Sequence, residues 1–411
     1  MHQIKINVSY IGKYIFLLIM LLPFIGISNF QYISKLSRYA FLNRFIDKLW
    51  YVNIAVILVY VLYVFLCTKR FLSVPCFLIV CIFSYLFIRT FIEGVKSQNV
   101  LTFIMFVLYA ELYIFKKKEN FLVFIDVLNT YVFLNFIFIL RYVNQGGLTY
   151  WSVREQKIWK GYYLLGYDNR FIVVILPLIC FTLILYRQTG NRKYLFALFV
   201  QLLSEILVKS AATFMALGCF GIFTLLQNSK IFIEIIYKPI NIALIYTVCF
   251  YGVVVVKIQY IVSSAVYYLF HKGLDTTRWR LWNEGLEKAE KNPLWGYGYG
   301  LETFGNNYLS PHNMFLEWMT QGGVIELLGY FVLIFIVLKK LYNNIDHYAA
   351  KIIYNGIVAF MFAYMAESYS IHVSYWSFLL LLLMAARLEY LIPLFGDRTE
   401  RWSQMSIQNE N

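Results

Sequence analysis

Charged side chains are scarce in this chain of 411 residues. Only 14% of the residues are Asp, Glu, Lys or Arg and 61% are hydrophobic, a balance that excludes an ordinary soluble protein. Strands of about ten residues with alternating hydrophobicity, which a membrane barrel requires, are also missing. Many apolar runs instead reach the roughly 20 residues that cross a bilayer as a helix. We therefore expect an all-α polytopic membrane protein.

Closely spaced cysteine pairs are missing as well. The six cysteines all fall in apolar runs without a CxxC motif, which excludes a typical zinc site and a disulfide framework. The sequence has no acidic cluster for a metal, and its glycine-rich stretch 296–300 lacks the Gly-Lys-Ser/Thr ending of a nucleotide-binding loop. No cleavable signal peptide stands out, because the first apolar run is long enough to be a retained span. We expect neither a metal nor a cofactor.

About twelve apolar segments have the length and composition of membrane spans. They cover roughly residues 14–30, 49–67, 71–92, 99–115, 121–142, 171–186, 194–209, 211–227, 239–257, 314–338, 351–367 and 374–392. The run 194–227 is divided in two because Glu205 and Lys209 lie in its middle.

The net charge of +14 is explained mostly by basic residues in short loops, which mark the cytoplasmic side of a membrane protein. Such loops, for example 116–118 and 187–193, recur on one side of the alternation, and both termini are predicted to share that side. The basic residues are dispersed, so nucleic-acid binding is not expected. The outer loops 31–48, 143–170 and 258–313 are also basic, and they either bind an anionic substrate or form ordinary solvated surface.

The stretch 275–321 mixes Arg, Trp, Gly, carboxylates and a Pro-His-Asn triplet, unlike the apolar sequence around it. Most of it belongs to the longest outer loop, 258–313. That loop separates nine predicted spans in residues 1–257 from three spans and a cytoplasmic tail in residues 314–411. We expect the chemistry of the protein in this loop.

An amphipathic helix is predicted over residues 277–291, and Asn292-Pro293 ends it. Its apolar face consists of Leu281, Trp282, Gly285, Leu286 and Ala289, and its polar face of Glu284, Glu287, Lys288 and Lys291. The glycines at 296, 298 and 300 then provide a turn that lets backbone approach closely. We expect the loop to fold back over the membrane face as short helices.

The sequence Ser310-Pro311-His312-Asn313 precedes the tenth apolar segment. It predicts an N-cap at Ser310 and Pro311 in the first helical position, so that His312 and Asn313 lie in the first turn. The helix start attracts anions and disfavours an imidazolium. A neutral His312 can then act as a general base. The alternative is an interfacial histidine that only caps the helix.

Together these residues resemble the signature of the O-antigen ligase and O-antigen polymerase superfamily. The matching elements, in order, are Thr277-Arg278 with Trp282, Asn292-Pro293, Gly296-Tyr297-Gly298, Pro311-His312-Asn313 and Gly322-Gly323. The pattern R-x3-W, N-P-x2-G-x-G, H-N and G is fairly specific, because several elements recur in order within one outer loop. The resemblance is strongest over about residues 270–330.

Two further stretches resemble the family more weakly. Residues 167–171 resemble an Asn-Arg-Phe stretch that is common in polymerases. In residues 209–213, Ala211 occupies the position at which many members carry an arginine after Ser or Thr. Lys209 either replaces that arginine or pairs with Glu205 at i,i+4.

The resemblance implies a metal-independent glycosyltransferase at the outer face of the bacterial inner membrane, with both termini in the cytoplasm. Such an enzyme transfers a glycan from a polyprenyl diphosphate onto an acceptor hydroxyl. Its partners are then the lipid-linked oligosaccharide and membrane lipid, and a chain-length regulator is a further implied partner. Nucleic acid is not among them.

The candidate catalytic residues are His312 as the base and Arg278 as the pyrophosphate ligand, because a guanidinium binds phosphate oxygens bidentately. Arg170 and Arg280 are the second and third candidates for the pyrophosphate. The other predicted substrate-binding residues are Asn169, Asn313, Trp282, Tyr297 and Lys209. The aromatic residues among them either stack on sugars or are ordinary interfacial residues. We predict that Arg170, Arg278 and His312 line one outer cavity.

Three functions follow from these observations. The Asn169-Arg170-Phe171 stretch and the missing arginine at Ala211 favour a polymerase, which extends the glycan on a second lipid carrier. A ligase, which delivers the glycan to a lipopolysaccharide core, is the alternative. A lipid-linked-sugar flippase is the non-enzymatic alternative, but it has no need of a long outer loop that carries both His and Arg.

Overall fold

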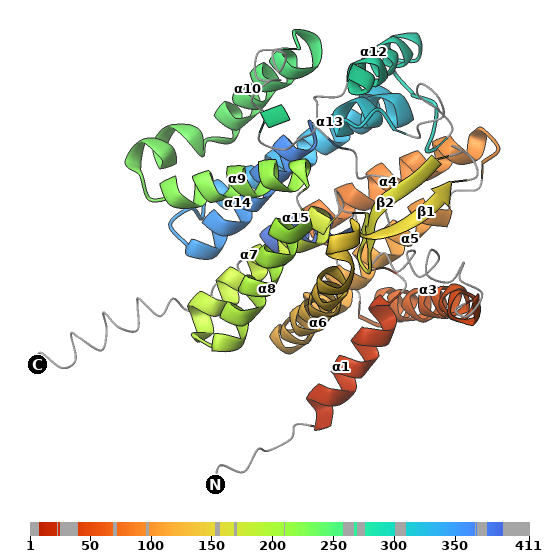
Figure 1. Cartoon of the computed structure of the whole chain (residues 1–411), viewed down its shortest axis with the longest axis vertical. Helices are drawn as coiled ribbons and strands as arrows, with labels where there is room; N and C mark the ends of the chain where they lie inside the picture. Colours follow the sequence, from red (N-terminus) through yellow and green to blue (C-terminus); the bar gives the residue numbers. More distant parts are fainter. Residues whose placement is uncertain are drawn as a thin grey trace, which may run out of the picture.

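The computed structural model of the chain is shown in Figure 1. It describes residues 8–22, 24, 40–68, 72–95, 98–152, 157–167, 171–208, 210–257, 267–268, 276–300, 310–365, 367 and 376–388. These residues form a bundle of apolar helices, with α12 and a small sheet near one end of it (Figure 1).

The helices of the first half are α1 (Val8–Leu21), α3 (Ala40–Thr68), α4 (Val74–Ile92), α5 (Gln98–Tyr109), α6 (Lys118–Tyr142), α7 (Phe171–Thr189) and α8 (Arg192–Val208). Those of the second half are α9 (Ala211–Leu226), α10 (Pro239–Phe250), α12 (Thr276–Lys291), α13 (Met314–Tyr342), α14 (Tyr348–Ala363) and α15 (Trp376–Ala386). Short π-helical segments follow α5 at Ala110–Ile114 and α10 at Tyr251–Val255, and another lies at Phe232–Ile236. A 3₁₀ turn at Val143–Gln145 follows α6.

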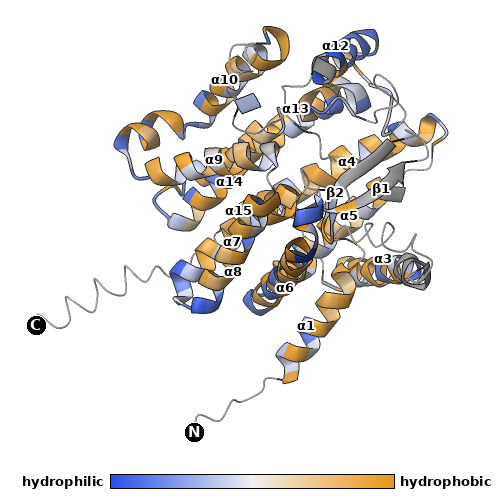
Figure 2. Ribbon diagram, viewed as in Figure 1, coloured by the Kyte–Doolittle hydropathy of each residue, from blue (hydrophilic) through white to orange (hydrophobic). Residues whose placement is uncertain are grey.

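Four helices of the described part are long and apolar enough to cross a membrane, and shorter apolar helices accompany them. The four are Lys48–Thr68, Val74–Ile92, Lys118–Gln145 and Phe171–Thr189. Apolar residues dominate the bundle, whereas polar residues gather on α12 and at helix ends (Figure 2). The structure therefore confirms a helical membrane protein. Each predicted apolar segment overlaps a helix, but the number of twelve crossings stays a prediction.

A small antiparallel sheet, which the sequence analysis did not predict, accompanies the helices. Strands β1 (Leu148–Ser152), β2 (Lys157–Tyr163) and β3 (Gly166–Tyr167) pair in the order β1-β2-β3. Leu148 pairs with Tyr162 and Ser152 with Lys157, and the register shifts between Leu148 and Tyr150. The sheet fills the predicted outer loop between α6 and α7, and α6 holds it because Asn135 Oδ1 accepts a hydrogen bond from Leu165 N at 2.9 Å.

The core of the bundle is built around α7. Nearly all of its residues from Phe171 to Leu185 are buried. It packs against α8, α14 and α15. The Arg187 guanidinium lies 4.3 Å from the ring centroid of Tyr348, which joins the end of α7 to the start of α14. The two helices are therefore antiparallel, and α14 ends near the level at which α7 begins.

The division of the run 194–227 is confirmed. Helix α8 ends at Val208, and α9 begins at Ala211 after an N-cap at Ser210, whose hydroxyl accepts from Thr213 N at 3.5 Å. Glu205 is fully buried near the end of α8. Lys209 lies outside the described residues, so its predicted pairing with Glu205 stays a prediction.

Candidate active site at the start of α13

Residues 276–291 form helix α12, which confirms the amphipathic prediction for residues 277–291. Leu281, Trp282 and Ala289 are buried on the predicted apolar face, whereas Leu286 is 37% exposed and corrects that prediction. A Cβ on Gly285 would lie 3.4 Å from side-chain atoms of both Leu316 and Pro311. The Gly285 backbone of α12 therefore lies directly against the start of α13, at a spacing that a Cβ would just fill.

The predicted close approach of the glycine-rich turn is also found. Gly296 has φ +62°, and a Cβ on it would lie 2.5 Å from the backbone carbon of Gln321. Tyr297 N donates to Thr320 O at 2.8 Å, and Gly298 N donates to Gln321 O at 2.7 Å. The turn thus lies against the backbone of α13, at a place where side chains have no room.

Helix α13 bends where this turn meets it. Gly323 has φ 66° and ψ −162° inside α13, and a Cβ there would lie 2.3 Å from Leu294 O. Val324 N beyond the bend donates to Pro293 O at 2.7 Å. The Asn-Pro, Gly-x-Gly and Gly-Gly parts of the sequence pattern therefore meet in one backbone junction.

Helix α4 anchors the same junction from the other side. The Tyr85 hydroxyl donates to Gly322 O at 3.0 Å and lies 3.2 Å from Trp295 O. The Arg89 guanidinium donates to Gly296 O at 3.0 Å, and Thr90 Oγ1 accepts from Tyr299 N at 2.8 Å. The junction is thereby fixed to the helical bundle.

The start of α13 differs from the prediction. Asn313, and not Ser310, is the N-cap: its Oδ1 accepts from Phe315 N and Leu316 N, both at 3.1 Å. Its Nδ2 donates to Met365 O at 3.0 Å, so this fully buried residue also joins α13 to the end of α14. His312 therefore precedes the helix and is not in its first turn. Its φ of 52° is unusual for a residue other than glycine.

The position of His312 brings it to a carboxylate that the sequence analysis missed. His312 Nδ1 lies 2.5 Å from Glu367 Oε1, and the Glu367 side chain is only 8% exposed. When Glu367 is ionised, it only accepts hydrogen bonds, and Nδ1 then carries the hydrogen. In the neutral imidazole, Nε2 then holds the lone pair that a base requires.

Arg278 reaches the same carboxylate from α12. Its Nη2 lies 3.4 Å from Glu367 Oε2. The side chains of Arg278 and His312 are 34% and 31% exposed, whereas Glu367 lies beneath them. The structure therefore brings the two predicted catalytic residues together, and Glu367 is the residue that joins them.

A sequence signal for Glu367 was present. It is a carboxylate at the outer end of the predicted span 351–367, and His312 is predicted to lie at the same face of the membrane. Ionisable residues at such positions in a membrane protein are functional candidates. The contact itself depends on the pairing of two chain segments, and Met314 N donates to Tyr364 O at 2.9 Å beside it.

The other predicted substrate residues are placed as follows. Arg280 points to solvent and pairs with Glu284 on the same helix, with Nε 3.5 Å from Oε1. Trp282 is buried between α12 and α13, and Tyr297 is half-buried. Asn169, Arg170 and Lys209 lie outside the described residues, so the predicted position of Arg170 beside Arg278 and His312 stays a prediction. Among the described residues, no group of three His, Cys, Asp or Glu side chains is placed to hold a metal ion.

The region around His312 is also similar in sequence to a known family of proteins. None of the curated proteins matches the chain. Residues 163–331 match the sequence model of a family described as O-antigen ligase. The matched segment contains Arg278 and His312, the Gly-x-Gly turn and the bend of α13, whereas Glu367 lies beyond its end. Through this segment, the chain is similar to the O-antigen ligase and polymerase superfamily.

Proposed function

We propose that the protein is a metal-independent glycosyltransferase that polymerises a surface polysaccharide such as O-antigen. It transfers a glycan from a polyprenyl diphosphate to a hydroxyl of a second lipid-linked repeat unit at the outer face of the bacterial inner membrane. The observation that carries this proposal is the convergence of His312 and Arg278 on the buried Glu367. The family match supports the reaction class.

His312 is the base of the proposed reaction. Its Nε2 takes the proton of the acceptor hydroxyl as the hydroxyl oxygen forms a bond to the anomeric carbon. Glu367 acts as a positioning residue, because its contact with Nδ1 fixes the tautomer and the orientation of the ring. It also stabilises the imidazolium that forms. Such an arrangement of base and carboxylate recurs on unrelated folds.

Arg278 is the proposed ligand of the leaving group. The bond between the anomeric carbon and the diphosphate oxygen breaks, and its electron pair stays on the diphosphate. A guanidinium stabilises this charge with directed hydrogen bonds. The contact with Glu367 holds Arg278 close to His312. His312 can then act on the acceptor hydroxyl while Arg278 binds the diphosphate of the donor.

The choice of a polymerase rests on the sequence. The Asn169-Arg170-Phe171 stretch favours it, as does the alanine at position 211, where the structure begins α9 after the Ser210 cap. A ligase is the second candidate, because the matching family model carries that description. We propose that residues 258–313 form the catalytic loop in either case, between the helices of residues 1–257 and those of 314–411.

The glycan profile of cells that lack the protein tests the proposal. A polymerase mutant is expected to carry single repeat units on its lipopolysaccharide core. Polymer that accumulates on the carrier lipid would instead indicate a ligase. Loss of every outer glycan with the repeat unit held at the inner leaflet would indicate a flippase and contradict the enzymatic proposal.

A further inference from the structure

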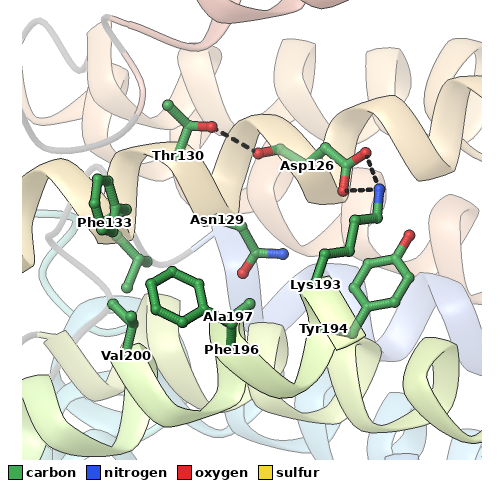
Figure 3. Close-up of a pocket in the computed structure, with 10 residues that line it drawn as sticks. Asp126, Asn129, Thr130, Phe133, Lys193, Tyr194, Phe196, Ala197 and Val200 are labelled. Carbon is green, nitrogen blue, oxygen red and sulfur yellow. Dashed lines mark hydrogen bonds and ion pairs between the residues drawn. The ribbon is translucent and has the colours of Figure 1, made fainter. Parts of the chain in front are cut away.

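We propose that a second site, between α6 and α8 at the end of the bundle opposite His312, binds the headgroup of a membrane phospholipid that carries a primary ammonium group. The site is a pocket with a polar and an apolar part (Figure 3). Its lining includes Asp126, Asn129 and Phe133 of α6 and Lys193, Phe196 and Ala197 of α8. The inference goes beyond the proposed glycosyl transfer and does not depend on it.

The position of the pocket follows from the helix directions. Lys193 lies at the start of α8, just after the turn that follows α7. The contact of Arg187 with Tyr348 puts this turn beside the start of α14, whereas Glu367 follows the end of α14. The pocket and the candidate active site are therefore at opposite ends of the bundle. The basic residues of this end predict that it faces the cytoplasm.

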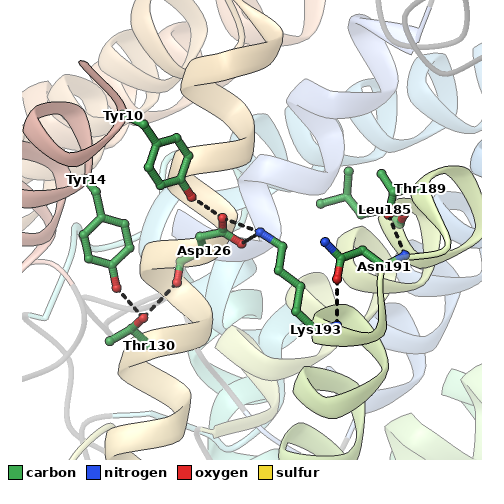
Figure 4. Close-up of polar contacts among 8 residues, drawn as sticks. All are labelled: Tyr10, Tyr14, Asp126, Thr130, Leu185, Thr189, Asn191 and Lys193. Atoms are coloured by element: carbon green, nitrogen blue, oxygen red, sulfur yellow. Dashed lines mark hydrogen bonds and ion pairs between the residues drawn. The ribbon is translucent and has the colours of Figure 1, made fainter. Parts of the chain in front are cut away.

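The polar part of the pocket contains one positive and one negative charge. Lys193 Nζ lies 3.0 Å from Asp126 Oδ1 and 2.8 Å from Oδ2, and the Tyr10 hydroxyl of α1 donates to Asp126 (Figure 4). The pair is electrically neutral as a whole, so it complements a zwitterion better than an anion. The positive Lys193 can bind the phosphate of a headgroup, and the negative Asp126 can bind the ammonium of the same headgroup.

The donors of the pocket suit the phosphate. A lysine ammonium has three N–H groups, and contacts with Asp126 use two of them, while the Lys193 side chain remains 48% exposed. Buried Gln201 donates to Asn129 Oδ1 at 2.7 Å, so the amide oxygen of Asn129 already has a donor. The Asn129 nitrogen is turned toward the Lys193 side (Figure 3). Lys193 and Asn129 together present N–H groups to a phosphate.

The acceptor of the pocket suits a primary ammonium. The Asp126 side chain is only 15% exposed, and two donors already contact it. A carboxylate offers about four lone-pair sites, so it can accept from one more N–H group. An ethanolamine ammonium can donate that hydrogen bond. A choline headgroup has no N–H group, so it cannot make the same contact.

The apolar part of the pocket continues from the headgroup into the bilayer. Phe133 of α6 and Phe196 of α8 are 39% and 57% exposed, and their ring centroids lie 6.2 Å apart. Ala197 lies beside them, and buried Val200 lies one turn deeper on α8. These residues offer apolar surface next to the charged pair, where the acyl chains of a bound phospholipid would begin. The order of polar and apolar surface therefore matches the order within a phospholipid.

Native mass spectrometry of the full-length, delipidated protein in detergent tests the proposal. An equimolar mixture of phosphatidylethanolamine, phosphatidylcholine and phosphatidylglycerol with identical acyl chains serves as the probe. We expect one phosphatidylethanolamine to bind in preference to the other two. Lys193→Ala should weaken this binding about tenfold, the value of one charge-assisted hydrogen bond. Lys230→Ala is the matched control, because Lys230 is 84% exposed and lies outside the pocket.

Ala197→Trp provides a second variant that leaves Asp126 and Lys193 in place. Its side chain would fill the pocket and should remove the same lipid, even if Lys193→Ala fails to fold. Equal binding of all three lipids by the wild type would overturn the headgroup assignment, as would preferred binding of phosphatidylglycerol. Unchanged binding in folded Lys193→Ala or Ala197→Trp protein would overturn the site.

Discussion

His312 Nδ1 lies 2.5 Å from Glu367 Oε1, although 55 residues separate the two in the chain. The contact exists because the cap of α13 and the end of α14 are joined by Asn313 and Met365. It places a carboxylate oxygen against Nδ1 of His312, and it gives the buried Glu367 a partner in addition to Arg278. The candidate active site is therefore a three-residue unit that α12, the start of α13 and the segment after α14 build together.

Glu367→Gln tests the positioning role of the carboxylate. The amide keeps the size of the side chain but removes the charge that stabilises an imidazolium, so the transfer rate should fall roughly 10²-fold. The rate is measured with purified protein and a lipid-linked donor. Glu284→Gln is the control, because Glu284 pairs with Arg280 on the same helix. This variant should keep nearly full activity. A Glu367→Gln rate equal to that of the wild type would contradict the role.

Arg278→Lys tests whether the guanidinium shape matters. Lysine keeps a positive charge beside Glu367 but presents a point charge in place of a planar fork. We expect a rate at least about tenfold below the wild type. Arg280→Lys on the same helix should have little effect, because Arg280 is exposed and pairs with Glu284. If Arg278→Lys works as well as the wild type while Arg278→Ala fails, only charge matters and the bidentate assignment is wrong.

Gly323→Ala tests the backbone junction. A Cβ would lie 2.3 Å from Leu294 O, and the positive φ adds backbone strain. We therefore expect the free energy of unfolding to fall by about 1–3 kcal/mol. The change is followed as a fall in the thermal unfolding midpoint in detergent. Gly218→Ala in α9 is the control, since no atom lies within 4 Å of its added Cβ. An unchanged midpoint for Gly323→Ala would contradict the close approach.

Asn313→Ala tests the corrected start of α13. It removes two capping hydrogen bonds and leaves the Met365 carbonyl without its donor, so the unfolding free energy should fall by about 1–2 kcal/mol. Ser310→Ala should cost less, because within the described part of the chain its hydroxyl accepts one hydrogen bond, from His312 N. The opposite order of the two midpoints would support the cap at Ser310 that the sequence alone predicts.

Patterns within one segment predicted much of this structure. The apolar runs predicted the helices, because a bilayer requires about 20 apolar residues for each crossing. The amphipathic pattern predicted α12, although the exposed Leu286 shows that a partner covers only part of the apolar face. The spacing of Gly296 and Gly298 predicted a close backbone approach, which the structure places against Gln321.

The remaining features depend on contacts between distant segments. Ser310 and Asn313 are both good capping residues, and the contact of Asn313 with Met365 favours the second position. The sheet of residues 148–167 is held partly by Asn135 of α6, which strand patterns alone do not reveal. The role of Glu367 also depends on distant segments. The sequence shows a carboxylate at the end of a span, but it does not show that His312 and Arg278 contact this carboxylate.

The central claim is that His312 is the base of glycan transfer, and the most direct test is the transfer rate of purified His312→Ala. The measurement uses a defined polyprenyl-diphosphate donor and acceptor, with the unfolding midpoint as a check of folding. The account predicts a folded protein that forms no product above background. Product formation at the wild-type rate by folded His312→Ala would contradict it.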